Sequence, residues 1–278
     1  MRRCHFFVFA LCLSSLSLLM LPSLAWAAPI PGSESIAQDI ASAGRLRMQS
    51  QRLAKLYQLA ALGMNAAAAR RQIMAACNEV DDEFRRLAKY ARQANTQRQL
   101  ARSEALWLEL RTAVNAGPEG RNGERVNQLA DELMLHTGKL AMQIEIAGEA
   151  PVGRLLDLSS RLNMLSQRLA RLYLLAHGGD RSQGVLTDLQ QARLEFASGL
   201  KELDTARENS PASREAIALA RNQWIFFELA IGDLNQARRG DGRAAQNVAT
   251  SSERIAQVLD EASAQYARDY ALGLRAAR

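Results

Sequence analysis

The chain has few of the residues that build metal centres, disulfide scaffolds or catalytic sites. Among 278 residues it has three cysteines and three histidines. Beyond position 27 only Cys77, His136 and His177 remain, and none stands in a cluster with metal-ligand spacing. No nucleophile with an attendant base, glycine-rich phosphate loop or cofactor motif is present. We therefore expect a protein that is not an enzyme and has no metal, cofactor or catalytic residues, with Cys77 as a buried structural thiol.

Aromatic residues (5%) and proline (six residues) are also scarce, and β-branched residues are sparse. Alanine, leucine, arginine, glutamine and glutamate dominate, which favours helix over sheet. Beyond position 27, prolines and glycine clusters occur only where a helix is expected to end. The sequence therefore predicts an all-α protein with eight helices, near Ser35–Ala61, Ala66–Arg92, Arg98–Asn115, Glu124–Ile146, Val152–Ala176, Ser182–Glu208, Ser213–Arg239 and Ala244–Leu274.

A strong excess of one charge is missing as well. The formal net charge is +6, and +4 without Arg2 and Arg3. Basic residues are interleaved with acidic ones throughout, and no basic stripe of the kind that binds nucleic acid is present. We expect no nucleic-acid partner.

The sequence contains one long hydrophobic run, at its start. Arg2 and Arg3 precede "FFVFALCLSSLSLLMLPSL", and the small residues of "AWA" follow at 25–27. This order is typical of a secretory signal peptide, which we expect to span residues 1–27 and to be cleaved. The alternative is an uncleaved membrane anchor, because the run is long enough to span a bilayer.

The eight expected helices form two sets of four with similar sequences. The first recurs 116 residues later, and the third recurs after 117 residues, where Trp107 corresponds to Trp224. In the fourth helix of each set, "HTGKLAMQIE" aligns with "SSERIAQVLDE". A repeat of this length is a duplicated domain, so we predict two tandem up-down-up-down four-helix bundles, at residues 35–147 and 151–275. The short connection "AGEAPVG" predicts that the bundles pack against each other or share a nearly continuous helix.

The first helix of each copy carries nearly the same segment, "GRLRMQSQRLAKLY" at 44–57 and "SRLNMLSQRLARLY" at 160–173. Helical winding at about 100° per residue separates three faces. The expected core face contains Leu46, Leu53 and Tyr57, and a flank with Arg45, Arg52 and Lys55 is expected to be solvated. A third face, suited to close approach by another helix, carries Ile40, Gly44, Arg47, Gln51, Ala54 and Gln58.

Arg47 is the only cation on this third face, and the second copy has Asn163 in its place. A buried unpaired charge costs several kcal/mol, so an enclosed Arg47 needs a partner. That partner can be an acid on another helix or a small anion, because a guanidinium fork matches an oxyanion. Alternatively, Arg47 reaches solvent.

These two segments resemble the characteristic box in the periplasmic domain of NarX-type nitrate/nitrite sensor kinases and PilJ-type type IV pilus chemotaxis transducers. The resemblance covers Ser35 to about Arg268 as two family domains. It implies four-helix sensor bundles in the periplasm. In NarX-like members, box arginines from two copies of the first helix grip nitrate or nitrite at a dimer interface.

The resemblance implies a ligand site at Arg47, Gly44 and Gln51, with Asn163 and Ser160 at the matching positions of the second copy. The anion site would then contain one guanidinium, from Arg47, and one amide, from Asn163, where the family's dimer site has two guanidiniums. Kinases and transducers of the family continue into a second membrane span and signalling modules, whereas this chain ends at Arg278. We therefore expect it to report through a membrane receptor or sensor kinase.

The leading hypothesis is a periplasmic binding module for a small oxyanion, nitrate or nitrite. The rival is a ligand-free adaptor for a type IV pilus or chemotaxis receptor, in which a protein acid satisfies Arg47. A third hypothesis is a homodimer through the first copy, which would rebuild a site with two arginines.

Overall fold

The structure is a computed structural model that describes residues 33–90, 93–118, 122–148, 151–232, 234 and 242–276. Residues 31–278 form one compact unit, and the expected signal peptide lies outside the described residues. The described chain is helical and has no strand, as the composition predicted. Its helices are α1 (Ser33–Ala61), α2 (Ala66–Tyr90), α3 (Ala94–Asn115), α4 (Gly123–Gly148), α5 (Pro151–Gly178), α6 (Gln183–Thr205), α7 (Pro211–Gly232) and α8 (Gly242–Ala276).

Most helix boundaries lie within a few residues of the expected ones. Proline opens α5 and α7, since its missing N–H is not needed in the first turn. Helix α6 ends at Thr205, earlier than expected, because Ala206 is extended and the Asn209 amide donates to the Leu203 carbonyl at 2.6 Å. Helix α3 begins at Ala94 instead of Arg98, with Thr96 buried in its first turn.

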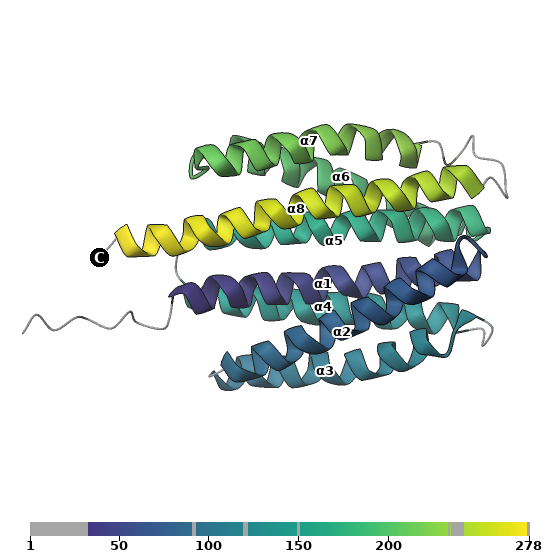
Figure 1. Ribbon diagram of the computed structural model, residues 1–278, viewed down its shortest axis with the longest axis horizontal. Coiled ribbons are helices and arrows are strands. Elements are labelled where there is room, and N and C mark those ends of the chain that lie inside the picture. Colours follow the sequence, from purple (N-terminus) through teal and green to yellow (C-terminus); the bar gives the residue numbers. More distant parts are fainter. Residues whose placement is uncertain are drawn as a thin grey trace, which may run out of the picture. The chain divides into compact units, whose positions relative to one another are not determined.

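The helices contact one another in two sets. In the first set, α1 packs on α2 and α4, and α3 packs on α2 and α4. In the second set, α5 packs on α6 and α8, and α7 packs on α6 and α8. The most extensive contact of all joins α1 to α5, which run side by side between the other helices (Figure 1).

Helices α1 and α5 are buried on nearly every side although they are not strongly apolar. Most of the buried polar residues among the described ones lie on these two helices. The expectation of a solvated flank on the first helix was therefore wrong for Lys55, which is 0% exposed. Buried polar groups need hydrogen-bond partners, so the contact between α1 and α5 must be held by specific polar interactions as well as by packing.

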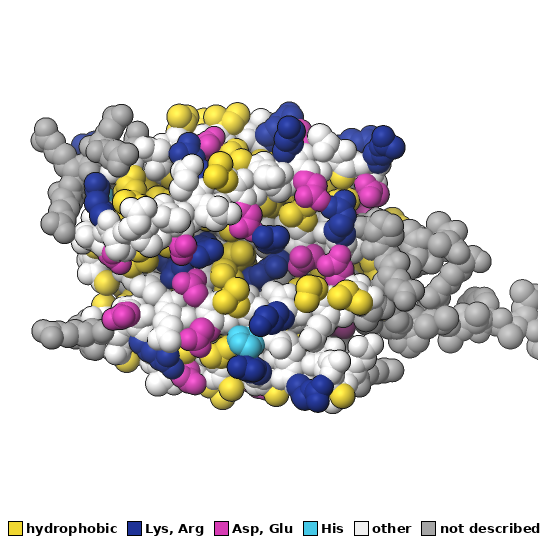
Figure 2. Space-filling view, turned by 180° about the vertical axis from the view of Figure 1, so that it is seen from behind, with side chains coloured by type: hydrophobic (Ala, Val, Ile, Leu, Met, Phe, Trp, Pro, Cys, Tyr) yellow, Lys and Arg dark blue, Asp and Glu magenta, His cyan; other side chains and the backbone are white. Residues whose placement is uncertain are grey.

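Large aromatic residues anchor the core of each set. Trp107 and Trp224, which correspond in the sequence repeat, are both buried. Cys77 is buried as expected, and burial raises the pKa of its thiol to about 11. Basic and acidic side chains are intermixed on the face shown in Figure 2. Within the described ranges, no helix has the length and apolar character needed to cross a membrane.

Candidate functional site

The two repeated segments meet where Gly44 of α1 faces Ser160 of α5. A Cβ atom added to Gly44 would lie 2.5 Å from the Ser160 Cβ and 2.6 Å from its Oγ. No side chain fits at such a distance, so glycine is needed for this approach. The two sequence-predicted residues are thus in direct contact, and they bring the third face of α1 against α5.

Arg47 is buried beside this contact, with a side chain that is 8% exposed. Its Nη2 donates to the Asp157 Oδ1 at 2.9 Å and to the Asp157 carbonyl at 3.1 Å. Burial lowers the pKa of the guanidinium, and the Asp157 carboxylate opposes that shift. The partner of Arg47 is therefore an acid on another helix, which was one of the alternatives left open by the sequence.

Arg47 is still not fully satisfied. Its Nε is buried and has no hydrogen-bond partner among the described residues. Gly138 on α4 leaves room for the side chain, since a Cβ there would lie 3.6 Å from the Arg47 Cδ. The Arg47 side chain thus lies between α4 and α5, and its ion-pair partner among the described residues is Asp157.

Asn163 lies on the other side of the contact between Gly44 and Ser160. It is 4% exposed, and its Oδ1 has no hydrogen-bond partner among the described residues. Together with Gly44 and Ser160 it lines a cavity of about 200 Å³ between α1, α2, α5 and α8, and Arg47 is not part of that lining. The structure therefore does not bring Asn163 and Arg47 to one site.

Gln51 faces α4. Its Nε2 donates to the Ala130 carbonyl and to the Asp131 Oδ1, both at 3.1 Å. The corresponding amide of Gln167 donates to the Ser252 carbonyl at 3.0 Å. Each glutamine therefore ties its helix to the last helix of its own set.

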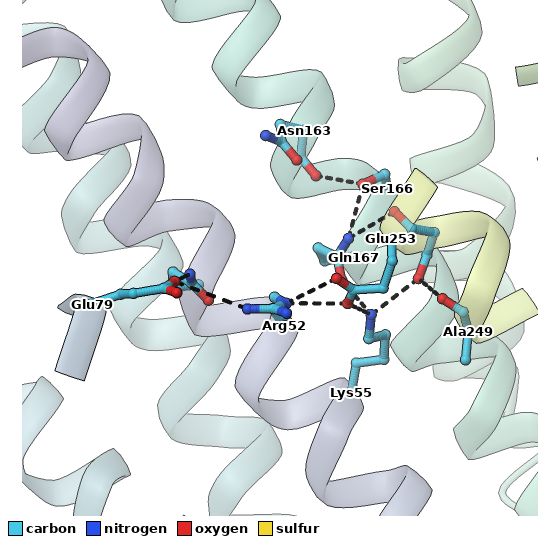
Figure 3. A network of polar contacts seen from close by, with 10 residues as sticks. Arg52, Lys55, Glu79, Asn163, Ser166, Gln167, Ala249 and Glu253 are labelled. Atoms are coloured by element: carbon cyan, nitrogen blue, oxygen red, sulfur yellow. Dashed lines mark hydrogen bonds and ion pairs between the residues drawn. The ribbon is translucent and has the colours of Figure 1, made fainter. Parts of the chain in front are cut away.

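Sequence reasoning missed a buried polar network around Lys55, which Figure 3 shows from close by. The Lys55 ammonium donates to the Gln167 Oε1 at 2.7 Å, to the Ser252 Oγ at 3.1 Å and to the Glu253 carboxylate. Arg52 also bonds Glu253, through Nε at 3.1 Å. A cation on α1 thus joins α5 and α8.

The matching residue of the second box segment, Arg171, makes the reciprocal connection. Its side chain is 1% exposed, and its Nη2 donates to the Asp131 Oδ1 at 2.7 Å. Its Nη1 donates to the Asn127 Oδ1 at 3.1 Å. Each box helix therefore sends one fully buried cation to the last helix of the other set.

Burial and mutual attraction together shift the pKa values of Lys55 and Glu253. Burial lowers the pKa of Lys55 to about 8, and the Glu253 carboxylate only partly compensates. Burial also opposes ionisation of Glu253, but Lys55 and Arg52 outweigh it and lower its pKa to about 2. The carboxylate therefore stays ionised at neutral pH.

These contacts correct the expected alignment of the fourth helices. Asp131 and Glu253 have equivalent roles and are 122 residues apart, whereas the sequence alignment paired residues 115 apart. The two alignments differ by seven residues, two helical turns, so both place apolar residues on the same face. Periodicity alone could not choose between them, and the polar contacts do.

Metal-ligating side chains are dispersed in the part of the chain that is described. No group of three or more His, Cys, Asp or Glu residues there could hold a metal ion. The arrangement can instead hold helices in a fixed relation through buried ion pairs, and it leaves one cavity beside the closest contact.

Comparison with known proteins finds one related family. Residues 31–132 match the PilJ family, described as the type IV pili methyl-accepting chemotaxis transducer N-terminal domain. This part of the chain, from α1 into α4, is similar to that domain and contains the first box segment but not the second. No curated protein and no solved structure matches.

Proposed function

We propose that the chain is a non-enzymatic periplasmic sensor module that reports its state through a separate membrane receptor or sensor kinase. The observation that carries this proposal is the close contact between the two box segments at Gly44 and Ser160, within and beside a PilJ-like domain. In this proposal residues 35–147 and 151–275 are two tandem up-down-up-down four-helix bundles, and the second is a diverged copy of the first.

Matching ion pairs support the duplication. Arg45 pairs with Glu83 on α2, and Arg161, 116 residues after Arg45, pairs with Glu195 on α6. Lys55 and Arg171 are also 116 residues apart and both reach across the contact between α1 and α5. Repeated contacts at repeated positions are what an internal copy of a dimer interface would have.

Nitrate or nitrite at Arg47 is the ligand that the box resemblance suggests. The unpartnered, buried Arg47 Nε favours an additional acceptor at this site. The anion would have to compete with Asp157, which already accepts from Nη2. In this proposal the anion binds the Arg47 guanidinium after the ion pair between Arg47 and Asp157 has opened.

Thermal unfolding of the purified chain, residues 28–278, tests this ligand. A ligand at about 100 times its dissociation constant adds about 2.7 kcal/mol to the stability of the folded state. We expect nitrate or nitrite, but not sulfate or acetate in chloride-matched buffer, to raise the melting temperature, and Arg47→Ala to abolish the rise. Asp157→Asn should increase it, because the competing carboxylate is removed.

The alternative is a ligand-free adaptor, which the ion pair between Arg47 and Asp157 favours. If no anion changes the melting temperature, the chain is better explained as an adaptor than as an oxyanion sensor. Both versions require a membrane partner. Crosslinking in the periplasm followed by mass spectrometry should capture a receptor or sensor kinase, and reproducible absence of one would contradict both.

A further inference from the structure

The contact between α1 and α5 has two related sides, which differ in the side chains that occupy them. On one side lie Arg47 and Asp157, joined by their ion pair. The repeat places Asn163 and Ala41 at the corresponding positions of the other side, each 116 residues away from its counterpart. There the cavity of about 200 Å³ is found, lined by both residues.

The fourth helices show the same asymmetry. With the correspondence of 122 residues, Glu145 of α4 matches Ala267 of α8, which lines the cavity. The charge of Glu145 acts on the side that contains Arg47 and Asp157, since both influence the pKa of Glu145. Alanine thus replaces a charged residue at two cavity positions, and the shorter asparagine replaces arginine at a third.

The walls of the cavity offer both acceptors and donors. The buried Asn163 Oδ1 has no hydrogen-bond partner among the described residues. Asp260 stands exposed at the cavity and makes no hydrogen bond or ion pair with the described residues. Arg45 bonds Glu83 through Nε and Ser42 through Nη2, which leaves Nη1 as a donor.

We propose that this cavity binds a small zwitterion, an α-amino acid or a close analogue, whose two charged groups replace the missing arginine and carboxylate. Its ammonium group is placed to donate to Asn163 and Asp260, and its carboxylate to accept from Arg45. The cavity is smaller than the ~300–1,000 Å³ typical of sites for drug-sized ligands, so only a small molecule fits. The inference rests on the proposed sensor function and adds a second ligand class, at a site separate from Arg47.

Isothermal titration of the purified chain with glycine, L-serine and L-arginine tests the site. Ethylammonium chloride and sodium acetate at matched concentrations supply each charged group alone. We expect saturable binding of at least one amino acid and none of the two controls. Binding of acetate equal to that of the amino acids would overturn the zwitterion and indicate a plain anion site.

A variant that fills the cavity gives the sharper test. Ala41→Asp with Asn163→Arg installs the ion pair of the opposite side, and we expect a folded protein that no longer binds the amino acid. The matched control, Arg47→Asn with Asp157→Ala, empties the opposite side and should retain binding. Amino-acid binding that persists after the cavity is filled would overturn the site.

Asp260→Asn keeps the test decisive if the filled variant fails to fold, because Asp260 is exposed. Loss of one charge-assisted hydrogen bond predicts binding weaker by about tenfold to hundredfold. Unchanged affinity would contradict the role of Asp260. If no amino acid binds but crosslinking still captures a membrane receptor, this inference fails and the proposed function stands; if neither is observed, both fail.

Discussion

At the scale of the residue, a missing Cβ at position 44 allows α1 to approach α5 closely. We expect Gly44→Ala to destabilise the fold by about 1–3 kcal/mol, the usual cost of overpacking, because its Cβ would overlap Ser160. Chemical denaturation measures the change. Gly184→Ala is the matched control, since a Cβ there meets nothing within 4 Å.

The reciprocal exchange identifies the contact as the cause. Gly44→Ser combined with Ser160→Gly moves the side chain to the other helix and should recover most of the stability lost in Gly44→Ser alone. A coupling energy near zero in this double-mutant cycle would show that the two residues do not limit the approach of the helices.

The sequence predicted some of these residues well and others poorly. Arg47 stood out because it was the only cation on an uncharged face, and its need for a partner followed from electrostatics. Lys55 did not stand out, because a lysine on a charged flank usually points to solvent. A signal was nevertheless present: the second box segment has a cation at the position that matches Lys55, Arg171, but none at the position that matches Arg47.

At the scale of the element, the pair of Lys55 and Glu253 ties α1 to α8. Glu253→Gln leaves the fully buried ammonium without its counter-charge, and removing one partner of a buried pair costs about 3–5 kcal/mol. The side chain of Glu253 is 37% exposed, so we expect a loss nearer to about 2 kcal/mol at pH 7. Chemical denaturation of this variant tests the expectation, with Glu79→Gln, which changes a more exposed acid, as the control.

The same pair predicts a pH dependence. The pKa of Glu253 falls from 4.5 when unfolded to about 2 when folded, so its contribution to stability is present above pH 4.5 and lost as the pH falls toward 2. We expect the melting temperature of Glu253→Gln to vary less between pH 5 and 3 than that of the unchanged protein. Parallel curves for the two proteins would contradict the predicted role of the carboxylate.

The positions of the helices were predictable from the sequence, whereas the alignment of α4 with α8 was not. Proline, glycine and apolar spacing located the eight helices of the described residues, because these signals act locally. The alignment of α4 with α8 depends on which polar groups meet across the contact, and that information lies in residues far apart in the chain. A shift of two turns preserves the apolar pattern, so only the contacts of Asp131 and Glu253 resolve it.

At the scale of the whole molecule, α5 and α8 cover a face of α1 that the first half cannot cover alone. We expect a fragment of residues 31–148 to self-associate through α1, with Ala41 of a second copy where the intact chain has Asp157. Each Arg47 then lacks its acid, and nitrate should strengthen the dimer. Light scattering after gel filtration, with nitrate or chloride, measures this; a folded monomer in both would contradict it.

Because α1 and α5 belong to one polypeptide, a substitution in either helix changes one side of their contact only. In a symmetric homodimer every substitution enters twice, and a residue that suits one side must also suit the other. Here glycine can face serine, and arginine on one side can coexist with asparagine on the other. A single gene can therefore evolve two unlike halves of one interface independently, without ever producing mismatched pairs of subunits.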